Sequence, residues 1–227
     1  MNYFLILIYM FLSFSVDAQT RGEQENTVAT VTILSGSPIN VYSGGEKKNI
    51  NEKNVPYVIY SGDEVQTANT SHCELLLSSG STIYVGPETL VSVNKRSKQY
   101  ESVFLKYGFM MFKGEKPIDF RAGDIYVNTI GGDFLARYAK TNFELTLLNF
   151  GSELYLKQSS DQIPLRLPKN RYIKAISFKD EKTWGDITIS SIPKLYEKFK
   201  VPFKPEGSSS YDSFSPKTSS ETKDRKS

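Results

Sequence analysis

Apolar and polar residues alternate in short runs along most of the chain. In TVATVTIL, Val31 and Ile33 fall on one face of an extended segment. In HCELLL, Cys73, Leu75 and Leu77 do the same. Gly, Asn or Pro residues separate these runs, and no run before residue 192 keeps a helical period. Many short strands without interleaved helices predict an all-β fold, either a multi-stranded roll or sandwich or a barrel.

Two segments of this pattern resemble each other. CELLLSSGSTIYV at 73–85 is similar to FELTLLNFGSELYL at 143–156. Each follows a Gly-Asp lead-in, GDEVQT from residue 62 and GDIYVNT from residue 123. One interpretation is a duplicated strand-turn-strand unit. The other is that any two hairpins with glycine turns look alike, and the sequence leaves both open.

The pattern changes near the C-terminus, where apolar residues recur at helical spacing. Positions i, i+3, i+4 and i+7 are held by Ile192, Leu195, Tyr196 and Phe199. Ser191 can cap a helix that has Pro193 in its first turn. We expect a short amphipathic helix that packs on its own domain, with docking to a partner as the alternative. Residues 204–227 are rich in Ser and charged residues, so we expect a disordered tail.

The N-terminus carries an apolar run, FLILIYMFLSF at 4–14, and then Val16 and Ala18 in the small-residue pattern of a cleavage site. We expect a secretory signal peptide cut after Ala18 and a periplasmic or secreted protein. No Lys or Arg precedes the run, so a retained N-terminal anchor is the alternative. No later run approaches ~18 apolar residues, so we expect no transmembrane span after cleavage.

The composition indicates the size of the fold and the class of partner. The 227 residues suffice for one domain with appendages, and 14 Tyr and 14 Phe supply bulky core side chains. The formal net charge is only +3, and the basic residues are scattered, so we expect no nucleic-acid partner.

The chain has one histidine and one cysteine, and they are neighbours, His72 and Cys73. Successive side chains of a strand point to opposite faces, so His72 cannot act as a general base for Cys73. We expect Cys73 to be a small buried hydrophobe and His72 to be solvated or to cap a loop. With no further His or Cys, we expect no metal site and no cofactor.

Carboxylates and aromatic residues are the remaining candidates for chemistry. Asp63, Asp124 and Asp133 stand beside glycines, where Asp commonly shapes a turn. An enzyme built on such carboxylates is the least favoured function, and we expect no catalytic residues. Trp184 is the best single candidate for stacking on a sugar, although anchoring of the C-terminal segment is favoured for it.

The stretch that begins at Gly62 resembles the FecR-type domain of bacterial envelope proteins. That family has a G-D-x-[VI]-x-T pattern, an alternating strand, a Gly-Ser turn and a second strand that runs into a proline. Later it has a glycine after a strand, a Val-x-Thr segment, a Phe-containing strand and a strand-Gly-strand. The residues that match as structural family positions are Gly62, Asp63, Val65, Thr67, Leu75, Leu77, Gly80, Ser81, Pro87, Gly108, Thr129, Phe134 and Gly151.

The resemblance covers roughly residues 60–156 and shows two departures. Ser79 stands where the turn usually has Asp, and Gly132-Asp133 stands where many members have Gly-Thr. Full-length members regulate sigma factors through a cytoplasmic anti-sigma segment, one membrane span and this periplasmic domain. The chain resembles the periplasmic domain alone, so direct sigma regulation is not expected.

The resemblance and the composition together imply the domain organisation. We expect a signal peptide at 1–18, a linker at 19–26, a FecR-like β domain at 27–158, a C-terminal extension at 159–203 that packs on it, and the tail at 204–227. The expected function is a non-catalytic protein-interaction or envelope-signalling module that contacts an unidentified envelope protein through strand edges or loops. The alternative is a module that binds peptidoglycan or another carbohydrate through exposed aromatic residues.

Overall fold

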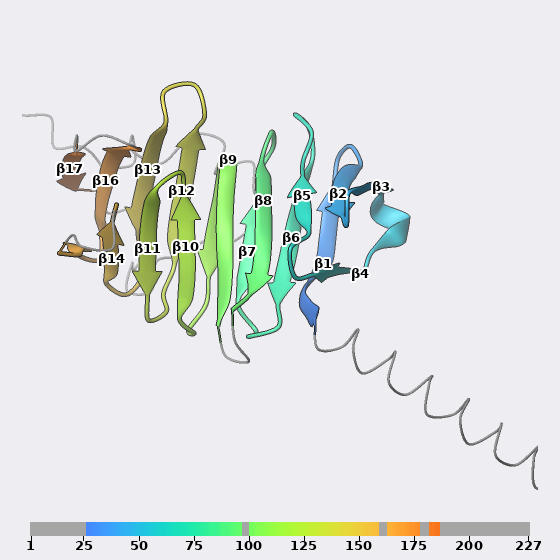
Figure 1. Ribbon diagram of the computed structural model, residues 1–227, viewed down its shortest axis with the longest axis horizontal. Helices are drawn as coiled ribbons and strands as arrows, with labels where there is room; N and C mark the ends of the chain where they lie inside the picture. The colour runs from blue at the N-terminus through green and yellow to red at the C-terminus, as the bar shows by residue number, and fades with distance from the viewer. Residues whose placement is uncertain (1–25, 97–99, 159–162, 178–181, 187–227) are drawn as a thin grey trace, which may run out of the picture.

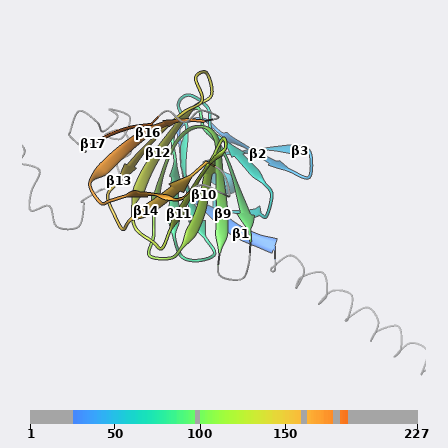
Figure 2. The same cartoon turned by 60° about the vertical axis from the view of Figure 1, so that its left-hand side comes forward.

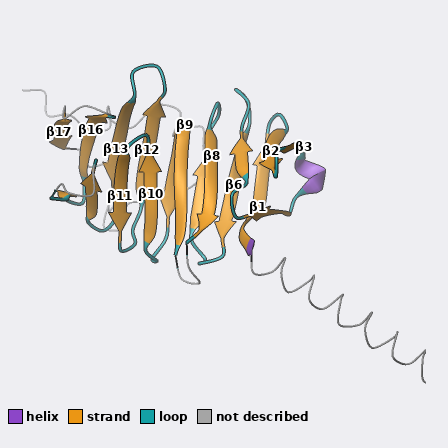
Figure 3. Cartoon of the chain, viewed as in Figure 1, coloured by secondary structure: helices purple, strands orange, loops and turns teal. Residues whose placement is uncertain are grey.

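The chain folds into two facing β-sheets, as the computed structural model shows for residues 26–96, 100–158, 163–177 and 182–186 (Figures 1 and 3). In spatial order, sheet A contains β4 (Tyr57–Tyr60), β1 (Thr27–Ser35), β6 (His72–Leu77), β7 (Thr82–Val85), part of β9 (Glu101–Lys113), β12 (Phe134–Ala139), β13 (Glu144–Asn149), β16 (Arg171–Ile176) and β17 (Lys182–Asp186). Sheet B contains β3 (Glu46–Ile50), β2 (Ile39–Ser43), β5 (Glu64–Gln66), β8 (Leu90–Lys95), the rest of β9, β10 (Ile118–Ala122), β11 (Ile125–Thr129), β14 (Leu154–Lys157) and β15 (Leu165–Leu167). A short 3-10 helix, η1 (Glu52–Asn54), precedes β4.

Strand β9 belongs to both sheets. Residues 101–107 pair in sheet B with β8 and β10, and residues 108–113 pair in sheet A with β7 and β12. Gly108 lies where β9 changes sheets and has a φ of +99°, a backbone conformation that residues other than glycine rarely adopt. The β9–β10 pair is parallel, and the other described pairs are antiparallel.

The main core lies between the sheets because alternate residues of every long strand point inward. Phe134 of β12 is central, with its ring centroid 5.3 Å from that of Phe112 and 5.4 Å from that of Phe120. Phe112 and Phe134 come from sheet A and Phe120 from sheet B, so these rings join the layers. In a view turned by 60°, β12, β13 and β16 lie on the upper side of the sandwich and β10, β11 and β14 on its lower side (Figure 2).

Sheet A has a second apolar layer on its other face. This outer cluster consists of Phe109, Met111, Leu135, Leu148 and Phe150, with Tyr84 and Tyr172 packed against it. It arises because β9, β12 and β13 carry apolar residues at successive positions instead of alternating strictly. Sheet A is therefore apolar on both faces at its centre.

The repeated unit is larger than the similarity of 73–85 to 143–156 suggested. The first segment forms the β6–β7 hairpin, but the second divides between β13, which pairs with β12 and β16, and β14, which pairs with β11 and β15. The matching units are β5–β8 and β11–β14. In each, the outer two strands pair in sheet B and the inner two form a hairpin in sheet A. Each unit follows a Gly-Asp pair. The two Gly-Asp pairs therefore marked the start of the repeated unit better than the similarity of the two segments did.

The all-β prediction is confirmed, in the form of a two-sheet sandwich. The described residues contain no helix long and apolar enough to cross a membrane. The expected signal peptide, the helix at 191–199 and the tail at 204–227 lie outside the described residues, as does most of the linker.

Candidate interaction surface

Several of the motif residues lie where the chain crosses between the sheets. Thr67 directly follows β5, and its N–H donates to the Thr89 carbonyl oxygen at 2.9 Å. Its hydroxyl donates to the Gly86 carbonyl oxygen at 2.5 Å and accepts from the Thr89 N–H at 3.0 Å. Pro87 follows Gly86, so Thr67 ties the start of the β6–β7 hairpin to its exit.

In the second unit, the two segments in which the chain passes between the sheets also contact each other. The Gly131 N–H donates to Thr129 Oγ1 at 3.0 Å, and the Thr129 hydroxyl donates back to the Gly131 carbonyl oxygen. The Gly151 N–H donates to the Asp133 carbonyl oxygen at 2.9 Å. A Cβ on residue 151 would lie 2.2 Å from the Asp133 nitrogen, so the approach of these segments requires glycine.

Gly62 and Asp63 shape the turn before β5. Gly62 has a φ of +95°, and Asp63 Oδ2 accepts a hydrogen bond from the Tyr60 N–H at 2.9 Å. The Asp63 N–H donates to the Tyr60 carbonyl oxygen at 3.0 Å. The side chain of Val65 is buried in the main core. This pair therefore sets the path of the chain into sheet B.

Gly80 and Ser81 form the turn of the β6–β7 hairpin. The Leu77 N–H donates to the Ser81 carbonyl oxygen at 2.8 Å, and Gly80 has a φ of +89°. Leu75 and Leu77 point into the main core. Together with the crossings, these positions make a framework that holds the two sheets.

Glu101 is a buried carboxylate that sequence reasoning missed. Its Oε1 accepts hydrogen bonds from the Ser79 N–H at 2.7 Å and from the Ser78 hydroxyl at 2.8 Å. Its Oε2 is buried without a hydrogen-bond partner among the described residues. A carboxylate from β9 therefore holds the turn of the β6–β7 hairpin.

His72 and Cys73 are separated by strand geometry, as predicted. Cys73 is buried in the main core with 2% of its surface exposed, and His72, at the first position of β6, is half-buried. Burial raises the pKa of the Cys73 thiol to about 12. A thiol that is protonated at neutral pH and screened from solvent is a poor nucleophile, so the pair is not a reactive dyad.

The three candidate aspartates serve different local structures. The Asp63 carboxylate stabilises the turn before β5, and Asp133 contributes its backbone carbonyl oxygen to the crossing at Gly151. Asp124 Oδ1 accepts from the Ser177 hydroxyl at 2.5 Å, and the Asp124 N–H donates to Ser177 Oγ at 3.0 Å. No group of His, Cys, Asp or Glu residues in the described part of the chain could hold a metal ion.

The outer face of sheet B carries a row of aromatic and basic side chains, all exposed except the half-buried Phe104. This aromatic strip consists of Phe104, Arg121, Tyr126, Tyr155 and Arg166. Phe104 pairs with Arg121 across β9 and β10, and Arg121 pairs with Tyr126 across β10 and β11. The register of three strands therefore brings these side chains together on one face.

Arg121 lies between two rings of the aromatic strip. Its guanidinium carbon is 5.2 Å from the Phe104 centroid and 4.9 Å from the Tyr126 centroid. The Arg121 Nε–H donates to the Gly123 carbonyl oxygen at 2.7 Å, which fixes the side chain. Cation–π contacts and this hydrogen bond hold a positive charge in place on an exposed face.

Tyr126 and Tyr155 are the exposed tyrosines of the strip. Their exposed fractions are 38% and 37%, and they project from neighbouring strands. The Tyr155 hydroxyl donates to Glu153 Oε2 at 2.9 Å, and Arg166 forms an ion pair with Glu153. The strip can stack on a planar group and can attract an anionic one.

The described edge strands of the sandwich are short. Among the described strands, β3 and β4 border one end of the sandwich and β15 and β17 border the other. All four have five residues or fewer, and Lys47 and Lys48 are exposed on β3. Short, charged edges hinder the addition of another strand. The edges therefore do not favour pairing with a strand of another protein.

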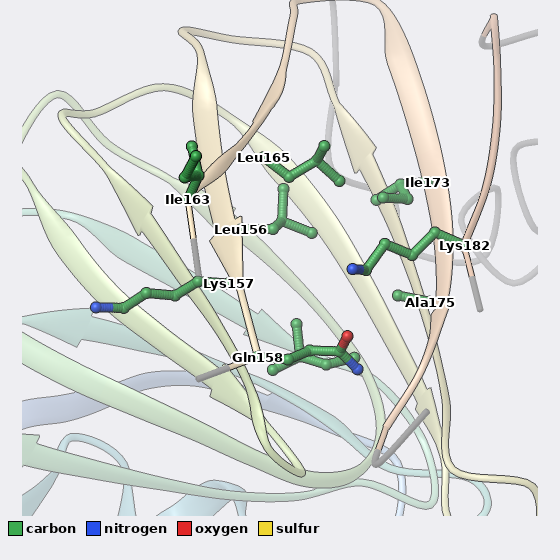
Figure 4. A pocket seen from close by; sticks show the side chains of 9 residues that line it. Leu156, Lys157, Gln158, Ile163, Leu165, Ile173, Ala175 and Lys182 are labelled. Carbon is green, nitrogen blue, oxygen red and sulfur yellow. The ribbon is translucent and has the colours of Figure 1, made fainter. Parts of the chain in front are cut away.

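A cavity of about 320 Å³ opens between the sheets near β15 and β16 (Figure 4). Its walls include Leu156, Ile173 and Ala175, which are buried aliphatic side chains. Lys182 extends toward this group, and Lys157 points away from it (Figure 4). The cavity is the apolar end of the main core, with no carboxylate or imidazole among its lining residues.

Trp184 was the expected candidate for stacking on a sugar, with anchoring of the C-terminal segment favoured for it, and the strip was not predicted from the sequence. The backbone of Trp184 pairs with Ile173 in sheet A, and its side chain lies outside the described part of the structure. The alternation of apolar and polar positions did indicate exposed tyrosines. Tyr126 and Tyr155 occupy the polar phase of strands whose other phase is apolar.

Comparisons with known proteins give a partial structural similarity. No protein-family model matches the chain, and no curated protein matches its sequence. Two crystal structures, at 2.50 and 1.65 Å resolution, of a "putative anti-sigma factor" from Parabacteroides distasonis ATCC 8503 are similar to it. Each has a TM-score of 0.47 and 16% identity over 54% of this chain and 59% of the solved chain. The match thus spans less than two thirds of those proteins.

Proposed function

We propose that this protein is a non-catalytic FecR-like module of the cell envelope that binds another envelope protein through the aromatic strip. The observation that carries the proposal is Arg121, held between Phe104 and Tyr126 on an exposed sheet face. Arg and Tyr are among the residues most enriched at the energetic centres of protein interfaces. A fixed guanidinium loses little conformational entropy when it binds a carboxylate.

The proposed location is the periplasm or the exterior. It is supported by the apolar run at 4–14 and the small residues at Val16 and Ala18. The FecR-like identity is supported by the order and spacing of the motif residues from Gly62 to Gly151. In this proposal the motif residues build the scaffold and the aromatic strip makes the contact.

The test is capture of a partner from cross-linked envelope extracts by immobilised protein. Arg121→Ala and Tyr126→Ala should each weaken capture of the same partner at least tenfold, as expected for interface hot spots. Matched controls are Arg137→Ala, an exposed arginine on sheet A, and Tyr100→Ala, an exposed tyrosine. Equal capture by all four variants would remove the strip from the interface.

A second candidate, binding of peptidoglycan or another glycan, is favoured by two exposed tyrosines on neighbouring strands, Tyr126 and Tyr155. Aromatic rings on a flat surface can stack on sugar rings. If this function holds, the protein should pellet with insoluble peptidoglycan, and Tyr155→Ala should reduce pelleting as strongly as Tyr126→Ala. Pelleting that depends on Arg121 but not on Tyr155 would instead indicate simple charge attraction.

A further inference from the structure

Two cations flank Tyr126 in one row on the outer face of sheet B. Arg121 of β10 pairs with Tyr126 of β11, and Tyr126 pairs with Lys157 of β14. Residues that pair directly across neighbouring strands project from the same face of a sheet. Lys157 is half-buried, and its amine points away from the cavity (Figure 4). The row therefore presents a cation, an aromatic ring and a second cation in that order.

The other charges of this face are paired. Three ion pairs lie on the face or at its border, and they join Arg96 to Asp119, Lys106 to Glu64 and Arg166 to Glu153. Among the described residues, no ion pair joins a carboxylate to Arg121 or to Lys157. Over strands β9 to β11, β14 and β15, the surplus positive charge of the face is therefore at these two side chains.

Arg121 is positioned to bind a carboxylate. Its guanidinium lies near the rings of Phe104 and Tyr126, and its Nε–H donates to the Gly123 carbonyl oxygen. Within the described part of the chain, this is the hydrogen bond that the Arg121 side chain makes, so the N–H groups at its Nη atoms stay available. The N–H groups at that end of a guanidinium match the two oxygens of a carboxylate.

The spacing of Arg121 and Lys157 fits two acidic residues of one segment. Their strands are two strand spacings apart, about 10 Å, with β11 between them. Residues seven positions apart share one face of an α-helix and are separated by about 10.5 Å along its axis. Residues three positions apart share one face of a polyproline II segment and are separated by about 9 Å. Either backbone can therefore place two carboxylates on the two cations at once.

We propose that the aromatic strip, together with Lys157, binds an acidic segment of the partner protein. Two carboxylates of that segment bind Arg121 and Lys157, and an apolar or aromatic side chain between them packs on Tyr126. This partner chemistry rests on the proposed function, because it takes the strip as the contact surface. A continuous polyanion, such as nucleic acid or an anionic membrane, fits less well, because Asp119 and Glu153 would lie against its charges.

The test measures binding of the full chain to a fluorescent copolymer of glutamate and tyrosine. Polyglutamate and a copolymer of lysine and tyrosine are the comparison probes. The glutamate–tyrosine copolymer should bind about tenfold or more tightly than the lysine–tyrosine copolymer, and more tightly than polyglutamate, which has no ring to pack on Tyr126. Binding should weaken as the ionic strength rises from about 0.01 to about 0.15 M, because the Debye length falls from about 30 to about 8 Å.

Arg121→Ala and Lys157→Ala should each weaken binding of the glutamate–tyrosine copolymer by about fivefold or more, and Lys157→Arg should retain it. The matched controls, Arg137→Ala and Lys174→Ala, remove exposed cations of sheet A and should change binding by less than about twofold. Equal losses in the control variants would overturn the proposal, because net charge alone would then hold the copolymer.

Tighter binding of polygalacturonate, an acidic polysaccharide, than of the glutamate–tyrosine copolymer would also overturn the proposal, by assigning the two cations to a glycan. Envelope capture that depends on Tyr126, without binding of the glutamate–tyrosine copolymer, would keep the proposed function and overturn the acidic segment. Envelope capture that does not depend on Tyr126 would instead contradict the proposed function, and the two failures are thus distinguishable.

Discussion

Gly108 lies against Thr89 so closely that a Cβ on residue 108 would be 2.3 Å from Thr89 Oγ1 and 2.5 Å from its Cα. The Thr89 hydroxyl accepts a hydrogen bond from the Phe109 N–H at 2.9 Å and donates to the Pro87 carbonyl oxygen at 2.9 Å. Thr89 also bonds Thr67 through its backbone. The point where β9 changes sheets is thereby joined to the crossing of the first repeated unit.

Gly108→Ala should destabilise the protein by about 2 to 5 kcal/mol, because it combines an unfavourable φ with an overlap that the backbone of Thr89 cannot relieve. Chemical denaturation followed by far-UV circular dichroism measures the change. The matched control is Gly45→Ala, which has a φ of +87° and open space around the Cβ. It should lose only about 1 to 2 kcal/mol, and equal losses would contradict a role for the Thr89 contact.

Thr67→Val should destabilise the protein by about 1 to 3 kcal/mol, although valine has nearly the same shape. The substitution leaves the Gly86 carbonyl oxygen and the Thr89 N–H without their bond to the hydroxyl in a buried region. Thr183→Val, at an exposed position of β17, is the control and should change the free energy of unfolding by less than about 0.5 kcal/mol. A neutral Thr67→Val would show that this tie is dispensable.

The local pattern of the chain was enough to predict the fold class. Alternation in segments such as 72–77 specifies a strand with one buried face, and the structure has that strand. The pairing of the strands could not be predicted from the local pattern, because it depends on segments that are distant in the sequence. Residues 143–156 look like a hairpin, but β13 and β14 follow partners in different sheets.

The aromatic strip could not be assembled from sequence for the same reason. Phe104, Arg121 and Tyr126 come from three strands, and only the parallel register of β9 with β10 aligns the first two. The outer cluster could not be predicted for a different reason. Phe109 and Leu135 break the alternation of their strands, and such positions do not reveal which of two faces is covered.

Glu101→Ala should lose about 2 to 3 kcal/mol, because the Ser79 N–H loses a charge-assisted hydrogen bond at the β6–β7 turn. Glu101→Gln should lose less than the alanine variant. Its amide oxygen can still accept from Ser79, and the substitution removes a buried charge whose Oε2 has no described partner. Thermal unfolding of the three proteins measures the order. A glutamine variant as unstable as the alanine variant would mean that the negative charge itself holds the turn.

Cys73 should make the protein less stable as pH rises from about 9 to about 12. Burial raises the pKa of its thiol from 9.0 to about 12, so in this window the unfolded chain releases the thiol proton and the folded chain retains it. The unfolded state then binds fewer protons, and the free energy of unfolding falls with pH by at most about 1.4 kcal/mol per pH unit from this group. Below pH 9 the contribution is fully present.

Cys73→Ala isolates this contribution, because lysine and tyrosine residues titrate in the same window in both proteins. Denaturation in urea at several pH values between 8 and 11 should give a steeper loss of stability for the parent than for the alanine variant, whatever their difference at pH 8. Thiol labelling gives an independent check, since the folded parent should resist a maleimide at pH 8 and react fully once unfolded. Parallel pH curves for the two proteins, or rapid labelling of the folded parent, would contradict the buried, protonated state of Cys73.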